Sequence, residues 1–261
     1  MIGFILGFLA GGAAAGGAAL WHFRRQGAQM GRFFSFAAHE INTPITAVNM
    51  TILNLLSGVF GDISPDQVQW IEMMREQLTR LNGMVGELRD LIHMELKNDL
   101  LVHLEDIPAA EAVETAVRAV RFGCAHANVV LEVSMPEDLP PLRADPDRLP
   151  RTVISLLFHA RKFRADGPIN LSAAVSGDRR SVELTVAYKG PKLTQEEADQ
   201  SLELYFPARQ RKDQNLTATG LGLGILKNLT ELQGGGLRIE ADGSGACRLK
   251  LTVPAGSANV S

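Results

Sequence analysis

The sequence contains little cysteine, no clustered histidines and almost no excess of charge. Its two cysteines, Cys124 and Cys247, lie far apart and form no CxxC pair. That usage is typical of reduced packing residues in a cytoplasmic protein rather than of disulfides or a zinc site. The six histidines form no HExxH or similar cluster, so we expect no structural metal site. A formal net charge of −3 gives no sign of a nucleic-acid partner.

An uncharged stretch near the N-terminus predicts a membrane anchor. Residues 2–21 carry no charged side chain, and about 20 such residues are enough to cross the core of a bilayer. Basic residues follow this stretch and none precedes it, which favours an anchor over a cleaved signal peptide and places the following chain in the cytoplasm. Its regularly spaced glycines fit a close helix interface or ordinary membrane-helix composition equally well. We therefore expect residues 1–25 to form a single-pass anchor in the inner membrane.

Two long helices are expected next. Residues 26–56 carry apolar side chains at steps of three or four, and residues 65–98 do so in a sustained heptad pattern. Glycines mark the turn between them, and Ser64 and Pro65 suit an N-cap and the first helical position. Because a single hairpin cannot bury its apolar stripe, we expect residues 26–98 to form a homodimeric four-helix bundle.

The stretch FAAHEINTPI, residues 36–45, places a histidine, an acid and a hydroxyl within about one helical turn. With Ile41 on the apolar stripe, His39 falls on the outer side of the helix and Thr43 lies on the same face one turn later. An exposed imidazole followed by the carboxylate of Glu40 can act as a nucleophile whose proton the neighbour accepts. The alternative is a helical hairpin with an incidental His-Glu pair.

A region of mixed helices and strands follows at residues 99–255, before a short tail at 256–261. We expect strands at 101–104, 129–133, 169–174, 182–187, 237–240 and 247–253. Helices are expected at 109–119, from the Asp145 region to 163, and at 220–232. The whole chain is therefore predicted to be α+β.

The stretch around His39 resembles the H-box of sensor histidine kinases, F-x-x-x-x-H-E-[LI]-[RK]-T-P-[LI], and departs from it notably at Asn42. The resemblance implies that His39 is the phosphoacceptor, Glu40 its acid/base partner and Thr43 the residue that positions water for dephosphorylating a response regulator. It also implies that residues 26–98 are the dimerisation and phosphotransfer domain. Residues 99–255 would then be the ATP-binding domain, an α/β sandwich with a helix layer on a mixed sheet.

The predicted ATP-binding domain departs from the family at its metal-binding helix. The family helix reads N-L-L-x-N-A-x-K-F, and its second asparagine supplies an oxygen to Mg²⁺. Here the stretch reads SLLFHARKF, with Ser155 and His159 at the two asparagine positions and Lys162 retained. Because Mg²⁺ prefers hard oxygen ligands, an imidazole is a poor replacement.

The other two nucleotide-binding motifs match the family patterns to different degrees. The adenine motif D-x-G-x-G corresponds to YKGPK, in which Tyr188 replaces the aspartate and Gly190 is retained. The phosphate loop keeps Gly220, Gly222 and Gly224, whose backbone N–H groups at a helix start suit an anion. A purely structural role in shaping that helix start is an equal alternative.

The resemblance with these departures predicts a degenerate member of the histidine kinase family, in which binding of ATP and Mg²⁺ is weakened or lost. It would dock the receiver domain of a response regulator, pass phosphoryl groups through His39, or remove them with the help of Thr43. Two alternatives stay open: a sensor kinase that still autophosphorylates His39 from ATP, and a non-catalytic scaffold.

Overall fold

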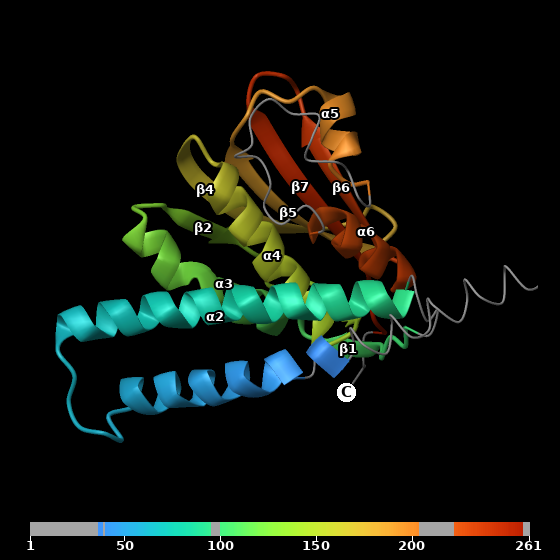
Figure 1. Ribbon diagram of the computed structural model, residues 1–261. Coiled ribbons are helices and arrows are strands. Elements are labelled where there is room, and N and C mark those ends of the chain that lie inside the picture. The colour runs from blue at the N-terminus through green and yellow to red at the C-terminus, as the bar shows by residue number, and fades with distance from the viewer. Residues whose placement is uncertain (1–35, 39, 95–99, 204–221, 258–261) are drawn as a thin grey trace, which may run out of the picture.

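A helical hairpin lies beside an α/β domain in the computed structural model, which describes residues 36–38, 40–94, 100–203 and 222–257 (Figure 1). The expected anchor, the predicted phosphoacceptor His39 and residues 258–261 of the tail lie outside the described residues. Among the helices that are described, none has both the length and the apolar character needed to cross a membrane.

The hairpin contains a first helix, which includes residues 40–56, and α2 (Pro65–Ile92). The predicted cap is confirmed, because the Ser64 side chain accepts a hydrogen bond from the Gln67 backbone N–H. In return, the Gln67 side chain accepts one from the Ser64 backbone N–H at 2.7 Å. This capping box pairs two backbone donors that would otherwise lack partners near the helix start.

The turn of the hairpin uses two glycines in a backbone region that other residues avoid. Gly58 has φ 75° and Gly61 has φ 102°, which glycine adopts without steric cost. At the far end, the α-helical part of α2 reaches Ile92 and a π-helical turn follows at 93–94. The predicted end near Asn98 lies outside the described residues.

The apolar stripes of the hairpin divide between two faces. Ala38, Ile45 and Val85 are buried together between the two helices. A second set stays 41–50 % exposed in the single chain: Ile41, Val48, Met74 and Leu81. Ile41, which the sequence places on the apolar stripe, is thus not buried within one chain. The exposed set is the surface that a second copy would cover in the predicted four-helix bundle.

The α/β domain is built on a five-stranded sheet in the order β2-β4-β5-β7-β6. β2 runs parallel to β4, and the other neighbours are antiparallel. The strands are β2 (Leu131–Ser134), β4 (Asp166–Val175), β5 (Ser181–Lys189), β6 (Gly236–Ala241) and β7 (Ala246–Pro254). In the central strands every second residue is buried, because one face of the sheet packs against helices.

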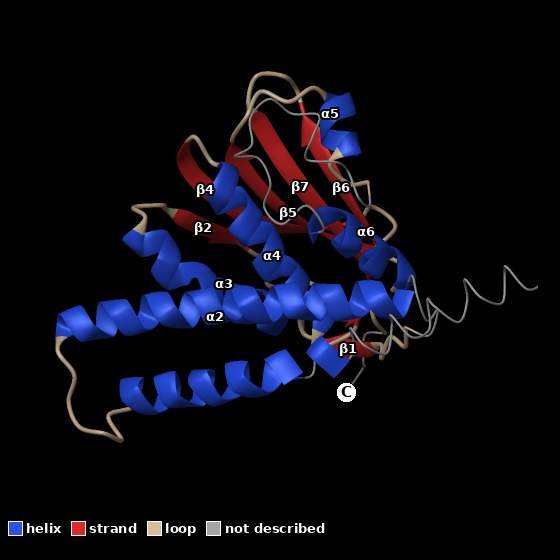
Figure 2. Ribbon diagram, in the orientation of Figure 1, coloured by secondary structure: helices blue, strands red, loops and turns tan. Residues whose placement is uncertain are grey.

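Three helices form a layer on that face of the sheet (Figure 2): α3 (Ala109–His126), α4 (Arg148–Phe163) and α6 (Gly222–Leu232). Their apolar sides and the inner face of the sheet share one core, which includes Val120, Leu156 and Leu249. Helix α2 of the hairpin lies across the outer side of this layer and contacts all three helices. The helix layer is therefore enclosed between the sheet and the hairpin.

The predicted order of the main helices and strands is confirmed, but three short elements depart from the prediction. The strand predicted at 101–104 is wrong: the strand is β1 (Glu105–Ile107), which pairs with the unpredicted β3 (Leu142–Ala144). Such three-residue strands depend on a partner distant in sequence, so local patterns do not locate them. Helix α3 extends to His126 instead of residue 119, and the short α5 (Gln195–Gln200) was not expected.

We predict that Leu249→Ala lowers the free energy of unfolding by about 3 kcal/mol, because it opens a cavity in the common core. Leu249 is fully buried and lies opposite Val186 and Ile239 in the sheet. The matched control is Leu101→Ala, because Leu101 is 87 % exposed and its loss should change the stability by less than about 0.5 kcal/mol. Urea unfolding measures both, and equal effects would contradict the assigned core.

Candidate functional site

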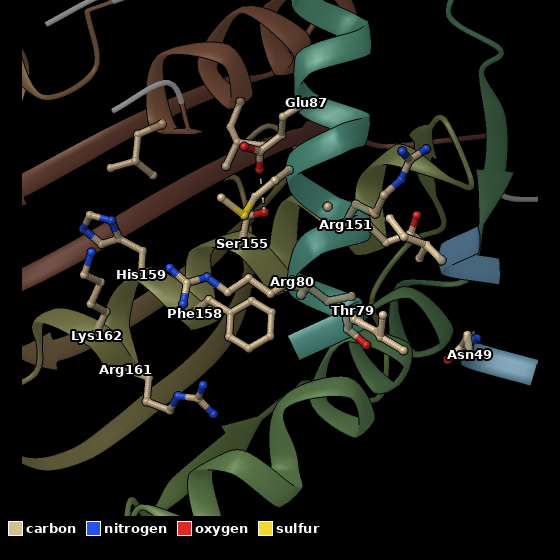
Figure 3. A pocket seen from close by; sticks show the side chains of 18 residues that line it. Asn49, Thr79, Arg80, Glu87, Arg151, Ser155, Phe158, His159, Arg161 and Lys162 are labelled. Atoms are coloured by element: carbon tan, nitrogen blue, oxygen red, sulfur yellow. Dashed lines mark hydrogen bonds between the residues drawn. The ribbon is translucent and has the colours of Figure 1, made fainter. Parts of the chain in front are cut away.

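A pocket of about 420 Å³ lies where the hairpin meets the α/β domain (Figure 3). Its walls come from the first helix, α2, α4 and α6. The first helix contributes Ile45 and Asn49, and α6 contributes Leu223 and Leu226. The volume falls in the range of small-molecule sites in proteins, and both domains are needed to enclose it.

The α4 wall of the pocket carries three of the sequence-predicted positions. Ser155, His159 and Lys162 are spaced by four and three residues, so they share one face of the helix, and all three line the pocket. The Ser155 hydroxyl donates a hydrogen bond of 2.9 Å to the carboxylate of Glu87 on α2. The family's metal-binding face of α4 is thus turned toward the hairpin.

The side chain of His159 is surrounded by aromatic rings. Its ring centroid lies 4.5 Å from that of Phe163 and 6.3 Å, edge-on, from that of Tyr188. Burial, with a smaller effect from the positive charge of Lys162, lowers the pKa of His159 to about 3. The imidazole is therefore neutral at physiological pH.

Tyr188 fills the position where the family motif has its adenine-binding aspartate. The ring lies at the end of β5 and is 6 % exposed. It packs against Gly190 so closely that a Cβ on this glycine would lie 2.6 Å from the Tyr188 ring. Burial raises the pKa of the Tyr188 hydroxyl, and the neighbouring Cys247 adds to that effect. The group here is a buried, uncharged phenol and not a carboxylate acceptor.

The described residues therefore suit the phosphate groups of a nucleotide better than its metal ion or its adenine ring. Lys162 suits phosphate, and so does the start of α6 at Gly222, because the first backbone N–H groups of a helix lack partners within it. The neutral imidazole of His159 offers the metal no oxygen ligand, and Tyr188 offers a buried, uncharged hydroxyl in place of the carboxylate that accepts from adenine in the family motif. Among the described residues, no group of three or more His, Cys, Asp or Glu side chains is placed to hold a metal ion.

Polar contacts that the sequence did not reveal join α2 to the helix layer along much of its length. Glu76 forms an ion pair with Arg161, and Asp90 forms one of 3.2 Å with Arg148. Charged residues of an amphipathic helix normally lie on its solvent-exposed face. Glu76 and Asp90 are instead both buried. A further hydrogen bond of 3.0 Å joins Gln69 to His126. Each pair is separated by more than 50 residues, so no local pattern connects its members.

Gly123 of α3 makes room for one of these pairs. A Cβ at this position would lie 1.5 Å from a carboxylate oxygen of Glu76 and 2.0 Å from a guanidinium nitrogen of Arg161. Any larger residue would therefore push the pair out of place. Cys124 lies beside the same guanidinium, and its pKa is raised by burial.

The remaining sequence-predicted residues lie apart from the pocket or outside the described chain. Glu40 and Thr43 are exposed on the first helix, the same helix that lines the pocket with Ile45 and Asn49. Gly222 and Gly224 form the start of α6, whereas Gly220 falls outside the described residues. Both cysteines are buried and free, as predicted.

Two protein families match successive parts of the chain. Residues 29–96, which include the hairpin, match the family described as His Kinase A (phospho-acceptor) domain. Residues 144–257 match the family described as Histidine kinase-, DNA gyrase B-, and HSP90-like ATPase. The two matches follow the order of the two domains in the structure.

Individual relatives agree with these matches. The circadian input-output histidine kinase CikA of Synechococcus elongatus is 28 % identical over 82 % of this chain and 28 % of its own length. The sensor histidine kinase ZraS of Salmonella typhimurium is 25 % identical over 83 % of this chain and 44 % of its own length. This chain therefore spans less than half of the length of either relative.

Solved structures of histidine kinases share the fold. Full-length ShkA in complex with AMPPNP has a TM-score of 0.59 at 18 % identity, over 87 % of this chain and 46 % of that chain. The histidine kinase AdeS of Acinetobacter baumannii has a TM-score of 0.53 at 21 % identity, over 84 % of this chain and 98 % of that chain.

We predict that Glu76→Ala lowers the free energy of unfolding by about 3 kcal/mol, because it leaves the guanidinium of Arg161 without its buried partner. The matched control is Glu114→Ala, which removes an ion pair to Arg118 whose side chains are both 71 % exposed. Its loss should change the stability by no more than about 0.5 kcal/mol. Chemical denaturation measures both variants, and a Glu76→Ala effect as small as the control would contradict a buried pair.

The lowered pKa of His159 predicts a loss of stability in acid. Below the unfolded-state pKa of about 6.5, the unfolded chain takes up a proton that the folded chain refuses, so stability falls as the pH falls toward 3. Because part of the ring opens into the pocket, we expect a loss of about 1–2 kcal/mol between pH 7 and pH 5. His159→Gln should remove this part of the pH dependence, whereas the control His103→Gln, at an exposed site, should retain it. Identical pH profiles for all three proteins would contradict the prediction.

Proposed function

We propose that this chain, which matches a phospho-acceptor domain family over residues 29–96 and an ATPase domain family over residues 144–257, is a sensor histidine kinase that transfers phosphoryl groups in two-component signalling through His39. The observation that most supports the proposal is that the hairpin, which would carry the phosphoacceptor, and the α/β domain, which would bind the nucleotide, line the same pocket. The helix that follows His39 in the sequence lines it with Ile45 and Asn49, and α4 lines it with Lys162. Glu40 and Ile45 lie five residues apart, about 7.5 Å along a helix axis.

In this proposal, the first reaction is the transfer of a phosphoryl group to His39. An imidazole nitrogen of His39 forms a bond to the γ-phosphorus of ATP, the bond from that phosphorus to the β–γ bridging oxygen breaks, and ADP leaves. Glu40 accepts the proton that the imidazole gives up. In a second transfer, an aspartate carboxylate of a response regulator displaces the imidazole from the phosphorus. Lys162 orients the phosphate groups of the donor.

ATP is the donor that the comparisons favour, in preference to the sequence-based expectation that ATP binding is weakened or lost. The match of residues 144–257 to an ATPase family and the shared fold with ShkA, whose structure contains AMPPNP, support a nucleotide in this domain. The intact positions that would serve it are Lys162, Gly222 and Gly224. No step is assigned to a metal ion, because the residues at the family's metal position do not fit one.

A second candidate function is favoured by the side chains of His159 and Tyr188. With a neutral imidazole and a buried phenol in place of an oxygen ligand and a carboxylate, the α/β domain would bind ATP poorly. The chain would then exchange phosphoryl groups with a regulator through His39, or hydrolyse the regulator's phosphoaspartate with water positioned by Thr43. This is the degenerate kinase that the sequence predicts.

The partners follow from the same proposal. A second copy of the chain would cover the exposed apolar set at Ile41, Val48, Met74 and Leu81, forming the four-helix bundle. The receiver domain of a response regulator would dock beside Glu40 and Thr43, which are exposed on the first helix. Residues 1–25 would hold the dimer at the inner membrane, with the catalytic part in the cytoplasm.

We predict that the full chain, incubated with γ-labelled ATP and Mg²⁺, acquires acid-labile label that is absent from His39→Ala. Phosphohistidine is labile in acid, and the alanine variant lacks the imidazole that would form the bond to phosphorus. Thr43→Ala serves as the matched control, because it should keep the label while slowing the dephosphorylation of a regulator. The readout is label retained on the protein after electrophoresis, with and without acid.

A different set of results would favour the second candidate. No label and no ATP binding by the wild-type chain would contradict ATP as the donor. The chain would then be incubated with a panel of purified receiver domains phosphorylated with acetyl phosphate. Loss of their phosphate in the presence of the wild-type chain, but not of His39→Ala or Thr43→Ala, would support phosphoryl exchange or hydrolysis. A chain inactive in both assays would leave the non-catalytic scaffold.

A further inference from the structure

The end of α2 and helix α6 share a small apolar core that is separate from the common core of the sheet and the helix layer. Leu91 of α2 is buried against Ile225 and Leu229 of α6. Met94 and Leu100, which follow α2 in the chain, pack against the same cluster. Figure 1 shows this end of α2 beside α6. One side of α6 is therefore covered by the hairpin.

Helix α6 is apolar on two sides, which pack against different parts of the chain. Leu226 is buried in the common core, whereas Ile225 and Leu229 are buried against the hairpin. Residues four apart lie on one side of a helix, so Ile225 and Leu229 form a continuous apolar strip. Without the hairpin this strip would face water, which is unfavourable. The α/β domain alone therefore does not complete the packing of α6.

A chain of polar contacts links the same two places. Asp90 of α2 forms an ion pair of 3.2 Å with Arg148, which also pairs with Asp145. The Asp145 backbone N–H donates a hydrogen bond of 2.9 Å to the side chain of Gln233. The Gln233 side-chain amide in turn donates one of 2.9 Å to the carbonyl oxygen of Leu229 on α6. Asp90, Asp145 and Gln233 are buried, so these contacts are shielded from water.

The other end of α6 carries two glycines of the phosphate loop. Gly222 and Gly224 form the start of the helix, and Leu229 lies seven residues after Gly222, about 10 Å along the axis. A helix is stiff over this length because its turns are joined by hydrogen bonds, so a displacement at Leu229 also displaces the start. The end of α2 therefore acts on the segment whose backbone N–H groups suit phosphate.

We propose that Asp90 and Leu91 are positioning residues, which fix the start of α6 relative to the hairpin. The proposal rests on the proposed function in taking the phosphates of the nucleotide donor as the groups that this helix start binds. It adds that Gly222 and Gly224 are presented correctly only while the end of α2 is packed against Leu229. Affinity for the donor therefore depends on the hairpin as well as on the phosphate loop.

The direct test measures backbone amide hydrogen exchange at residues 222–229 of the full chain. Leu91→Ala removes the side chain that the hairpin contributes to the small core. It should speed exchange at 222–229 about tenfold, because local opening of α6 becomes less costly. The matched control is Leu101→Ala, the same substitution at an exposed side chain, which should change exchange by less than about twofold. Equal exchange in Leu91→Ala and the wild type would overturn the proposal.

A second measurement separates the positioning of α6 from a general loss of stability. A variant that is merely less stable contains less active protein, which lowers the maximal rate of His39 labelling from γ-labelled ATP without changing the half-saturating ATP concentration. Leu91→Ala should instead raise that concentration about fivefold. The conservative Leu91→Met should stay within about twofold of the wild type. In a wild type that is labelled, an unchanged half-saturating concentration in Leu91→Ala would contradict a positioning role.

Asp90→Asn tests the polar contacts without opening a cavity, and it can be measured even if Leu91→Ala does not fold. The loss of the charge that pairs with Arg148 should speed exchange at 222–229 about fivefold. The matched control is Asp106→Asn, which weakens the 3.3 Å ion pair to Arg143 within the α/β domain and should change this exchange by less than about twofold. An Asp90→Asn effect no larger than the control would overturn the role of Asp90.

The outcomes distinguish this inference from the choice of ATP as donor. If the wild-type chain is labelled from ATP and Leu91→Ala matches it in both measurements, ATP stands as the donor and the inference is overturned. If the wild type is not labelled but Leu91→Ala speeds exchange at 222–229 and Leu101→Ala does not, the hairpin positions α6 and the donor proposal fails. If the wild type is not labelled and exchange is unchanged, both are overturned.

Discussion

The ion pair between Glu76 and Arg161 is the contact on which the junction of the two domains depends. Removing two charges from water is costly, and the cost is recovered only when each finds its partner in good geometry. The pair is enclosed by α2, α4 and the backbone of Gly123 on α3. That enclosure fixes how closely α2 approaches the helix layer, and it thereby sets the width of the neighbouring pocket. The positions of Ser155 and Lys162 relative to the hairpin follow from it.

Much of the fold could be predicted from the sequence because its signals are local. The cap at Ser64, the glycine turn at Gly58 and the alternation of β5 and β7 each depend on residues a few positions apart. β1 and β3 could not be predicted, since each is a strand only because it pairs with the other, and the paired residues Ile107 and Leu142 are 35 positions apart. The division of the hairpin stripe into a buried and an exposed set was also missed, because a heptad pattern does not say which helix each position faces.

The candidate site was predicted by residue type but not by location. The motifs identified Ser155, His159 and Tyr188 as positions where the residue differs from the family's nucleotide-binding residue. They identified Lys162 as a position where that residue is retained. They did not indicate that this face of α4 would lie against the hairpin, nor that α2 would supply Arg80 and Glu87 to the same pocket. Residues that meet only through tertiary packing leave no pattern in a single sequence. The ring contacts of His159 illustrate this. Phe163 is four residues away on the same helix, whereas Tyr188 comes from a strand that is distant in the sequence and could not be linked to His159.

Helix α2 is one continuous helix of 28 residues, about 42 Å long. Its bonds to the helix layer begin at Gln69 and end at Asp90, a span of about 32 Å on the same rise per residue. A stiff rod held at points so far apart cannot pivot about one of them without straining the others. Separate loss of single contacts along α2 is therefore disfavoured, and we expect the contacts between the hairpin and the α/β domain to be lost together.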